Sequence, residues 1–457
     1  MAPRIVVIGG GSVQWVPKLL RDFANTPALH GAEVVIEDID AASVPRMVGL
    51  VEHIARVRGI PLSATGTTDQ RAALAGADFV VVAISTGGFA SMRHDLEIPA
   101  RHGIHQTIGD TVGPGGVFRA LRNIPVLIGV ARDMEELCPE AWMLNVTNPM
   151  TTLCRAVTGQ TSIRAVGLCH EITITHLLLS LLLDVSYFDV DMTVVGVNHF
   201  PVITDLRLAG ADGFARLRSL LEGDGAALDE PLAWELPDGV LHGQPLGDRW
   251  TKRDIVARSR IKLDLFTRFG VLPGAGDRHL AEFFAGYLTD ESAWGADWGV
   301  QLVPIEVHER SQVEHRAEFD RALAADAVDP WPSGELVAPL IDSLITGTER
   351  SLPLNIPNDG SVSDLPDRVA VETICRVDAG GVRGRETAEL PPFLAEHLRR
   401  ISASQEFTVR AALSGRRGEV LDALQTDPLA GRMDARRLEL LTDELLAATR
   451  PWLPQFA

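Results

Sequence analysis

The sequence of 457 residues predicts an α/β protein with two domains. Three observations lead to this prediction. Short apolar runs alternate with helical patterns over the first part of the chain, polar residues follow each run, and the alternation weakens after about residue 200. The expected architecture is a doubly wound parallel sheet over residues 1–200 and a second, mostly helical α+β domain over residues 201–457.

Six apolar runs are the candidate strands. Each is apolar almost throughout, which suits strands that are buried on both faces, as in a parallel sheet. Helical patterns lie between them, for example over 13–24 and 117–136, so right-handed crossovers are expected. The runs are Arg4–Ile8, Val34–Asp38, Asp78–Ile84, Trp142–Val146, Ile163–Leu168 and Met192–Val197.

The residues that follow these runs form the candidate site. They read GGGS, DID, STGG, TNP, CHE and NHF in chain order. In an open parallel sheet, ligands bind outside the carboxyl ends of the strands, so these motifs are expected to line one crevice. Any one of them alone is explained as well by an ordinary polar strand end.

The second domain is expected to be mostly helical, with some strands. Helical patterns cover 210–222, 255–269 and most of 391–450, with breaks near Gly415 and Pro428. The stretch 228–249 is rich in Pro, Gly and Trp and is expected to be a loop or flap. Together with the first domain, this predicts the Rossmann-type architecture of lactate and malate dehydrogenases.

Composition narrows the function. A net charge of -19 argues against nucleic acid or an anionic membrane surface as a partner. We find neither a secretion signal nor an apolar run long enough to span a bilayer. The four cysteines form no CxxC pair, which favours a reducing cytoplasm and leaves a thiol free to act as a ligand.

The first strand end predicts a dinucleotide site. Gly9, Gly10, Gly11 and Ser12 lie between a strand and a helix, where glycines let the backbone approach a pyrophosphate. The third glycine of the usual fingerprint is replaced by Gln14. Asp38 ends the second run, where it can bind ribose hydroxyls and repel a 2′-phosphate, so NAD is favoured over NADP. Further cofactor contacts are expected from Ser85 and Asn145.

The fifth and sixth strand ends predict a metal site. Cys169 closes the fifth run and His199 follows the sixth, and a thiolate with an imidazole suits a divalent transition metal that has open positions. The alternative is a buried thiol and an ordinary core histidine. Two other segments are rich in charged residues. Arg93–Gly116 is loop-like and is expected to be a substrate lid. Gly274–Phe283 is a second candidate part of the site, and the alternative for it is a solvated helix start.

The motifs together resemble those of glycoside hydrolase family 4, the NAD- and metal-dependent glycosidases. The resemblance covers most of the chain and follows the family order. It is carried by GGGS, DID, the R-x-x-x-x-x-P run from Arg93 to Pro99, GDTVGPGGVFRALRNIP, TNP, CHE, VNHF, GDRHLAEF and NIPNDGSVSDLP.

The resemblance implies an oxidation–elimination mechanism rather than the two-carboxylate mechanism of most glycosidases. NAD takes a hydride from C3 of the sugar, a base removes the acidified C2 proton, and the group at C1 leaves. Water then adds, and the reduced cofactor returns the hydride. A metal such as Mn²⁺ polarises the C2 and C3 oxygens.

The resemblance also implies roles for individual residues. Cys169 and His199 are the metal ligands, and Arg93, Asn148 and Asp110 hold the sugar. His170 is the candidate acid on the leaving-group side. Because neither tyrosine of this chain lies in a matching motif, Asp277 is the candidate C2 base, with Arg278 as a substrate clamp.

The residue after Cys-His indicates the sugar. The CHE form, ending in Glu171, resembles α-galacturonidases, whereas CHS resembles α-galactosidases and CHG resembles α-glucosidases and α-glucuronidases. We therefore expect an α-D-galacturonide, with an α-glucuronide or a neutral α-glycoside as the alternative. Family members assemble as homodimers or homotetramers. A 2-hydroxy acid dehydrogenase and a nucleotide-binding scaffold on the same fold are the remaining alternatives.

Overall fold

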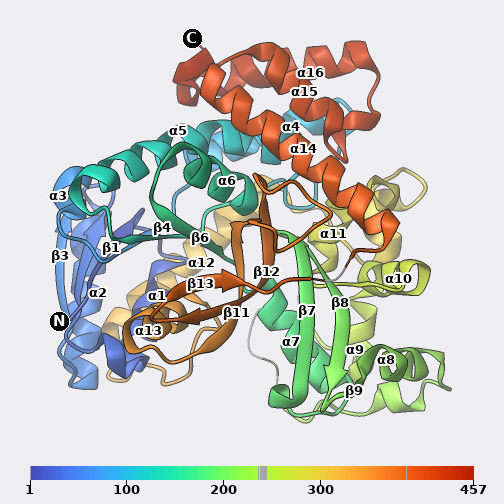
Figure 1. The fold of residues 1–457 in the computed structure, drawn as a ribbon, viewed down its shortest axis with the longest axis horizontal. Coiled ribbons are helices and arrows are strands. Elements are labelled where there is room, and N and C mark those ends of the chain that lie inside the picture. Colours follow the sequence, from blue (N-terminus) through green and yellow to red (C-terminus); the bar gives the residue numbers. More distant parts are fainter. Residues whose placement is uncertain (1, 235, 237–243, 388, 457) are drawn as a thin grey trace.

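The structure is a computed structural model that describes residues 2–234, 236, 244–387 and 389–456. Its strands join into one large sheet with a parallel half and an antiparallel half (Figure 1). The parallel half has the strand order typical of dinucleotide-binding domains. In that order its members are β3 (Ser63–Thr67), β2 (Glu33–Glu37), β1 (Arg4–Ile8), β4 (Phe79–Val82), β5 (Trp142–Asn145) and β6 (Arg164–Leu168).

The antiparallel half continues the sheet beyond β6. It contains β11 (Arg350–Pro357), β12 (Ala370–Asp378), β7 (Val190–Val197), β8 (Phe200–Leu208) and β10 (Leu272–Pro273), in that order. Two short strands pair at its margins: β9 (Ala211–Asp212) with β8, and β13 (Gly381–Gly384) with β12. The second half of the chain is thus built onto the sheet of the first half, which agrees with the predicted α/β fold class.

The sixth apolar run is a strand, but it does not belong to the parallel sheet as expected. β7 runs antiparallel to both β8 and β12, and β11 and β12 separate it from β6. Its apolar pattern is explained by burial within a mixed sheet, which requires no parallel partner. β3 was missed because its sequence, SATGT, is largely exposed at the sheet edge and has no apolar pattern.

Helices cover both faces of the parallel half (Figure 1). On one face lie α4 (Gly88–Arg101), α5 (Gly113–Leu137) and α6 (Met150–Gln160), and on the other lie α1 (Val16–Asn25), α2 (Ser43–Arg58) and α13 (Val337–Thr346). The prediction that Arg93–Gly116 is loop-like is wrong at both ends, since α4 extends to Arg101 and α5 begins at Gly113. The polar composition of this segment and Pro99 suggested a loop, but Pro99 sits in the last turn of the helix.

The second half supplies the predicted helices. Beside the antiparallel strands lie α7 (Glu171–Leu182), α8 (Gly213–Glu222), α9 (Lys252–Ala257), α10 (Arg260–Phe269), α11 (Asp277–Phe283) and α12 (Ile305–Ala324). The tail forms α14 (Pro392–Ser414), α15 (Arg417–Thr426) and α16 (Ala435–Thr449), with breaks at the predicted positions. The predicted helix over 255–269 is interrupted at Arg258 and Ser259. Part of the expected flap, 235 and 237–243, lies outside the described residues.

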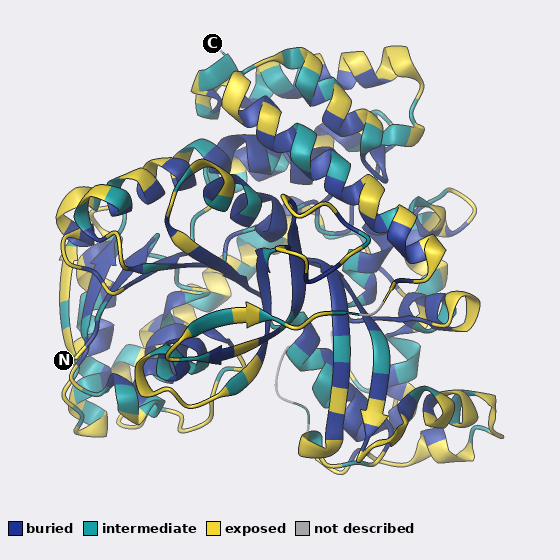
Figure 2. Cartoon of the chain, in the orientation of Figure 1, coloured by how far each residue is buried: buried dark blue, intermediate teal, exposed yellow. Residues whose placement is uncertain are grey.

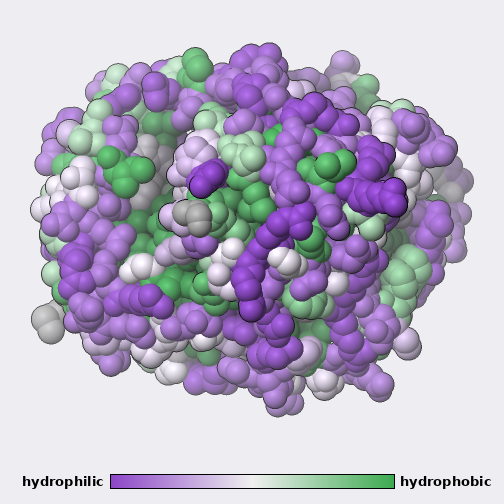
Figure 3. Space-filling model, turned by 90° about the horizontal axis from the view of Figure 1, so that it is seen from above, coloured by the Kyte–Doolittle hydropathy of each residue, from purple (hydrophilic) through white to green (hydrophobic). Residues whose placement is uncertain are grey.

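The main core follows the sheet, whose strands are largely buried in Figure 2. A second, smaller core packs α7, α8 and α10 against β7 and β8. Seen from above, the surface is mostly hydrophilic, and hydrophobic side chains gather near the middle of that face (Figure 3). Within the described part of the chain, each helix is too short or too polar to cross a bilayer.

Candidate active site

The predicted cofactor elements meet at the carboxyl ends of β1 and β2. The Gly10 N–H donates to the carbonyl oxygen of Glu37, and the Gly11 N–H donates to Asp38 Oδ2, at 2.8 Å each. A Cβ on Gly11 would overlap both the Asp38 carboxylate and the Ser43 hydroxyl, so only glycine allows this approach. The GGGS turn and Asp38 therefore form one unit, and α1 begins at Val16, a few residues later than predicted.

The other two predicted cofactor residues lie at neighbouring strand ends. Ser85 is exposed in the turn after β4, where its carbonyl oxygen accepts from the Gly88 N–H. Asn145 ends β5 and is buried. Its side-chain amide is hydrogen-bonded in both directions to the backbone of Thr147, so it shapes the TNP turn. A cofactor contact from either residue stays a prediction.

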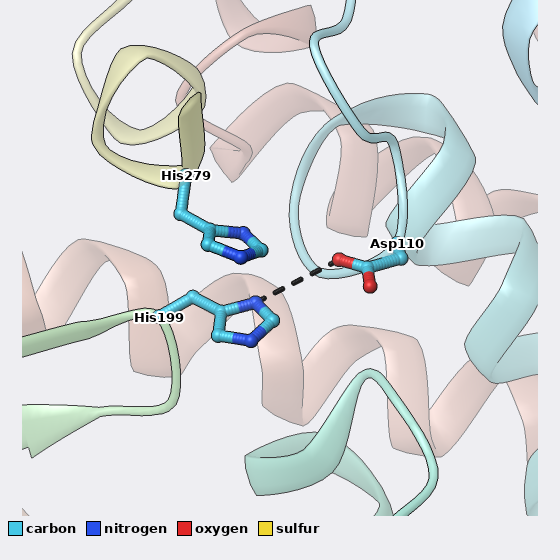
Figure 4. A group of neighbouring side chains, drawn as sticks. All are labelled: Asp110, His199 and His279. Atoms are coloured by element: carbon cyan, nitrogen blue, oxygen red, sulfur yellow. Dashed lines mark ion pairs between the residues drawn. The ribbon is translucent and has the colours of Figure 1, made fainter. Parts of the chain in front are cut away.

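Three side chains from distant parts of the chain form a compact cluster (Figure 4). Asp110 comes from the loop between α4 and α5, His199 from the β7–β8 turn, and His279 from α11. One ligand atom of each lies within 4.8 Å of the others. The two imidazole rings stack, with centroids 3.5 Å apart. His199 adopts a φ of 65°, a left-handed conformation that is uncommon for a residue other than glycine.

Hydrogen bonds fix the cluster. The Thr111 hydroxyl donates to Asp110 Oδ1 at 2.6 Å and lies 2.6 Å from His199 Nδ1. Because a hydroxyl has one proton, Thr111 accepts from the Nδ1–H of a neutral His199, and the Nε2 lone pair of that ring stays available. The Asn148 amide donates to Asp110 Oδ2 at 2.8 Å, which joins the TNP turn to the cluster.

The charges in the cluster suit metal binding. Burial lowers the pKa of His199 to about 3, with a further contribution from His279, and burial also lowers the pKa of His279. Both rings are therefore neutral near pH 7. Burial acts to raise the pKa of Asp110, but Arg119, the Thr111 hydrogen bond and the two imidazoles, which act as cations only at low pH, outweigh it and hold that pKa well below its usual range. The cluster thus offers an ionised carboxylate and two neutral imidazoles.

The CHE residues follow β6, at the start of α7. Burial raises the pKa of Cys169 well above its usual value, as do the charges of Glu372 and Glu171, so this side chain is a thiol near neutral pH. It packs with Met150, Cys154 and Ala370 and is not part of the Asp110–His199–His279 group.

His170 and Glu171 face different partners. His170 Nδ1 lies 3.2 Å from a Glu335 carboxylate oxygen, and the His170 side chain is half-exposed. Glu171 Oε2 accepts from the Gly276 N–H at 2.6 Å. Burial acts to raise the pKa of Glu171, but His279, His170 and His199 outweigh it and lower that pKa to about 2. Glu171 begins α7, as predicted, and its ionised carboxylate belongs to the surroundings of the cluster.

Asp277 and Arg278 precede His279 on α11. The Asp277 carboxylate accepts from the backbone N–H groups of Ile261 and Lys262, at 2.8 and 3.0 Å, and so holds the first turn of α10. Burial raises the pKa of Asp277 to about 6. The guanidinium of Arg278 is under the influence of Glu282, Asp110 and Glu171. Its charge therefore lies near the cluster, whereas the Asp277 carboxylate is directed to α10.

Arg93 is engaged by carboxylates. Its guanidinium, on α4, binds Glu97 on the same helix and Glu306 and Glu309 on α12, at 2.8 to 2.9 Å. These contacts join α4 to α12. A role in holding sugar hydroxyls stays a prediction, and it requires Arg93 to exchange at least one carboxylate for the substrate.

Sequence reasoning missed three contributors to the site. His279 lies within the charged segment Gly274–Phe283, whose residue pattern does not predict a metal ligand. Thr111, within the GDT motif, and Arg119 on α5 were not considered. Arg119 Nε donates to the Asn148 carbonyl oxygen at 3.1 Å, and its charge acts on Asp110. The sequence signal for Thr111 and Arg119 was their place in the motif GDTVGPGGVFRALRNIP, and for His279 its place in the motif GDRHLAEF.

Comparison with known proteins identifies the family. Residues 4–185 match the family described as "Family 4 glycosyl hydrolase", and residues 194–430 match its C-terminal domain. An α-galacturonidase of Lachnoclostridium phytofermentans is 31% identical over 99% of this chain and 97% of its own length. An α-glucosidase of Erwinia rhapontici is 29% identical over 99% of both chains.

A solved structure supports the fold. A 6-phospho-α-glucosidase from gut microorganisms, in complex with NAD and Mn²⁺, has a TM-score of 0.81 and 20% identity, and the match covers 100% of both chains. The match of both family domains, in order and over nearly the whole chain, agrees with the motifs at the strand ends. The protein belongs to the family 4 glycosyl hydrolases.

Proposed function

We propose that the protein is an NAD- and divalent-metal-dependent α-glycosidase that cleaves α-D-galacturonides. The observation that carries this proposal is the Asp110–His199–His279 cluster, which lies beside the TNP turn in a member of the glycosidase family. The solved relative that contains NAD and Mn²⁺ supports the same two cofactors here.

The donor set of the cluster fits a divalent first-row metal. One carboxylate and two neutral imidazoles leave positions open for substrate oxygens. Two buried polar atoms, Nδ1 of His279 in the cluster and Oδ1 of the adjoining Asn148, have no hydrogen-bond partner within the described residues. His199, Asp110 and His279 would hold the metal, and Cys169 stays the further ligand that the family resemblance predicts.

The glycine turn of residues 9–12 fits a dinucleotide, because the Gly11 N–H donates to Asp38 and so holds the turn against the carboxylate that follows β2. When bound, NAD supplies a reversible hydride acceptor for C3 of the sugar, and the metal supplies a Lewis acid for the C2 and C3 oxygens. Asn148 and Asp110 would orient the sugar hydroxyls. His170, held by Glu335, would donate a proton to the leaving group, and Asp277 would remove the C2 proton.

The α-galacturonide assignment rests on the CHE motif, on the α-galacturonidase relative and on charge. Arg119 and Arg278 both act on Asp110, and burial lowers the pKa of each. Guanidinium groups bind carboxylates through charge-assisted hydrogen bonds, so a uronate carboxylate is a suitable ligand for this part of the site. Glu171 would not oppose this, because its carboxylate is bound to the Gly276 N–H.

The test is aryl release from a panel of 4-nitrophenyl α-glycosides. The panel contains the galacturonide, glucuronide, glucoside and galactoside, each with NAD, Mn²⁺ and a reductant, and with each addition omitted in turn. We expect the highest kcat/KM for the galacturonide and loss of activity without NAD or Mn²⁺. A preference for another sugar would overturn the galacturonide assignment. Net NADH formation on a 2-hydroxy acid, without aryl release, would overturn the glycosidase function itself.

We further propose that the enzyme acts in the cytoplasm as a homodimer or homotetramer. All four cysteines are free and buried, which fits a reducing compartment. Sedimentation of the purified protein tests the assembly, and a monomer at micromolar concentration would contradict it.

A further inference from the structure

α12 brings one more titratable side chain to the site. His308 lies in its first turns, and the charges of Arg278, Asp110 and Arg119 all act on its ring. These three residues come from α11, the loop before α5, and α5 itself. Glu306, on the same helix, has a lowered pKa as well, but its hydrogen bond to Arg93 is the main cause.

The helix periodicity directs His308 inward. Side chains three, four or seven residues apart share one face of a helix. Ile305, His308, His315 and Phe319 follow this spacing. Ile305 and Phe319 are buried and the two histidines are half-buried, so this face packs against the protein. The Nε2 atom of His308 is buried and has no hydrogen-bond partner within the described residues.

Two carboxylates hold this turn of α12 in place. Glu306 and Glu309, on either side of His308, bind Arg93 on α4 at 2.8 and 2.9 Å. α4 leads through residues 102–109 to Asp110. The position of His308 relative to the cluster is therefore fixed by a direct contact between α12 and α4, and not only by the loops that flank α12.

We propose that His308 is a substrate-binding residue that donates its Nε2–H to the carboxylate of the galacturonide, beside Arg278, and so selects uronates over neutral sugars. This role rests on the proposed function. Arg278 and Arg119 make the surroundings of the ring cationic, and burial lowers the pKa of His308, with Arg278 acting in the same direction. A neutral imidazole can donate one N–H, and a carboxylate accepts it strongly in a buried site.

The test compares the binding of D-galacturonate and D-galactose by calorimetry, in the presence of NAD and Mn²⁺. The two sugars differ at C6, which carries a carboxylate in one and a hydroxymethyl group in the other. We expect His308→Ala to weaken D-galacturonate binding about tenfold or more, and D-galactose binding less than about twofold. His308→Gln keeps an N–H donor and should recover part of the loss.

His315→Ala is the matched control, because His315 lies two turns further along the same face of α12. It should leave both affinities unchanged. Equal weakening of both sugars by His308→Ala, or no weakening, would overturn the role of His308 and leave an α-galacturonidase in place. A wild-type protein that binds D-galactose more tightly than D-galacturonate would overturn both the substrate assignment and this role.

Discussion

His199 and Asp110 are linked through the hydroxyl of Thr111. His199 Nδ1 lies 3.7 Å from Asp110 Oδ1, and Thr111 Oγ1 lies 2.6 Å from each of these atoms. This link places the proton of neutral His199 on Nδ1 and orients the ring, while Nε2 stays available as a ligand atom. Groups that orient a metal-binding imidazole usually change metal affinity when they are removed.

Replacing Thr111 therefore tests the link. Thr111→Val keeps the shape but removes the hydroxyl, so we expect Mn²⁺ affinity to fall by about 10- to 100-fold. Thr111→Ser keeps the hydroxyl and should bind Mn²⁺ within about threefold of the wild-type protein, on the same scale. Titration of free Mn²⁺ by electron paramagnetic resonance measures both. Equal affinity in Val and Ser variants would show that the hydroxyl has no part in metal binding.

The proposed metal ligands are tested in the same titration. His279→Ala removes one of the two imidazoles, and we expect Mn²⁺ affinity to fall by at least about tenfold. We expect a similar loss for Cys169→Ser, as the family resemblance predicts. Cys154→Ser is the control, because Cys154 is buried in the same small cluster as Cys169 but is not a predicted metal ligand. Wild-type affinity in Cys169→Ser, with a loss in His279→Ala, would limit the site to Asp110, His199 and His279.

Glu372 predicts a pH-dependent change in stability. Burial raises its pKa to about 7 from an ordinary 4.5, although Asn198 and Asn355 donate to its carboxylate. The native protein therefore binds more protons than the unfolded chain between these two pH values. The stabilising contribution of Glu372 is complete below pH 4.5 and is lost as the pH rises through about 7.

The corresponding variant is Glu372→Gln, which keeps an acceptor for both asparagines and stays neutral. Its melting temperature relative to the wild-type protein should rise between pH 5 and pH 9, by a few degrees, which is roughly the effect of 1 kcal/mol in a protein of this size. Differential scanning calorimetry measures the trend. Glu52→Gln, at an exposed position on α2, should show none. A difference that is constant with pH would mean that Glu372 is ionised throughout.

Much of the fold could be predicted from the sequence, because strands buried on both faces appear in it as short, continuous apolar runs. Five of the six apolar runs are strands of the parallel sheet, and the GGGS turn lies where it was expected. β3 could not be found, since an exposed edge strand needs no apolar residues. The direction of β7 could not be found either, because burial on two faces looks the same in a parallel and an antiparallel strand.

The candidate site was predictable only in part. Asp110, Asn148 and His199, each of which lies in a motif of the sequence, are close together in the structure. The place of His279 against His199 depends on how α11 packs beside the β7–β8 turn, and that is a tertiary contact between residues 80 positions apart. Two of the three carboxylates around Arg93, those of Glu306 and Glu309, depend in the same way on α12. Local sequence patterns do not predict such tertiary contacts.

Asp277 is the proposed C2 base, and its hydrogen bonds to α10 define the experiment. We expect Asp277→Asn to lose at least 99% of the exchange of the C2 proton with solvent, a factor of about 100, because an amide cannot accept this proton. One acceptor oxygen remains for α10, so the variant should stay folded. Asp264→Asn, on α10 itself, controls for disturbance of that helix. Wild-type exchange in Asp277→Asn, with a lower melting temperature, would assign Asp277 to helix capping instead.

The most direct test of oxidation–elimination is the fate of the C2 hydrogen in the wild-type enzyme. 4-Nitrophenyl α-D-galacturonide would be hydrolysed in D₂O with NAD and Mn²⁺, and the released galacturonic acid analysed by proton NMR. We predict that the product carries deuterium at C2, because elimination removes that proton before water adds. If the galacturonic acid formed in D₂O kept its original hydrogen at C2, the mechanism would be contradicted. Direct displacement at C1 would then be indicated.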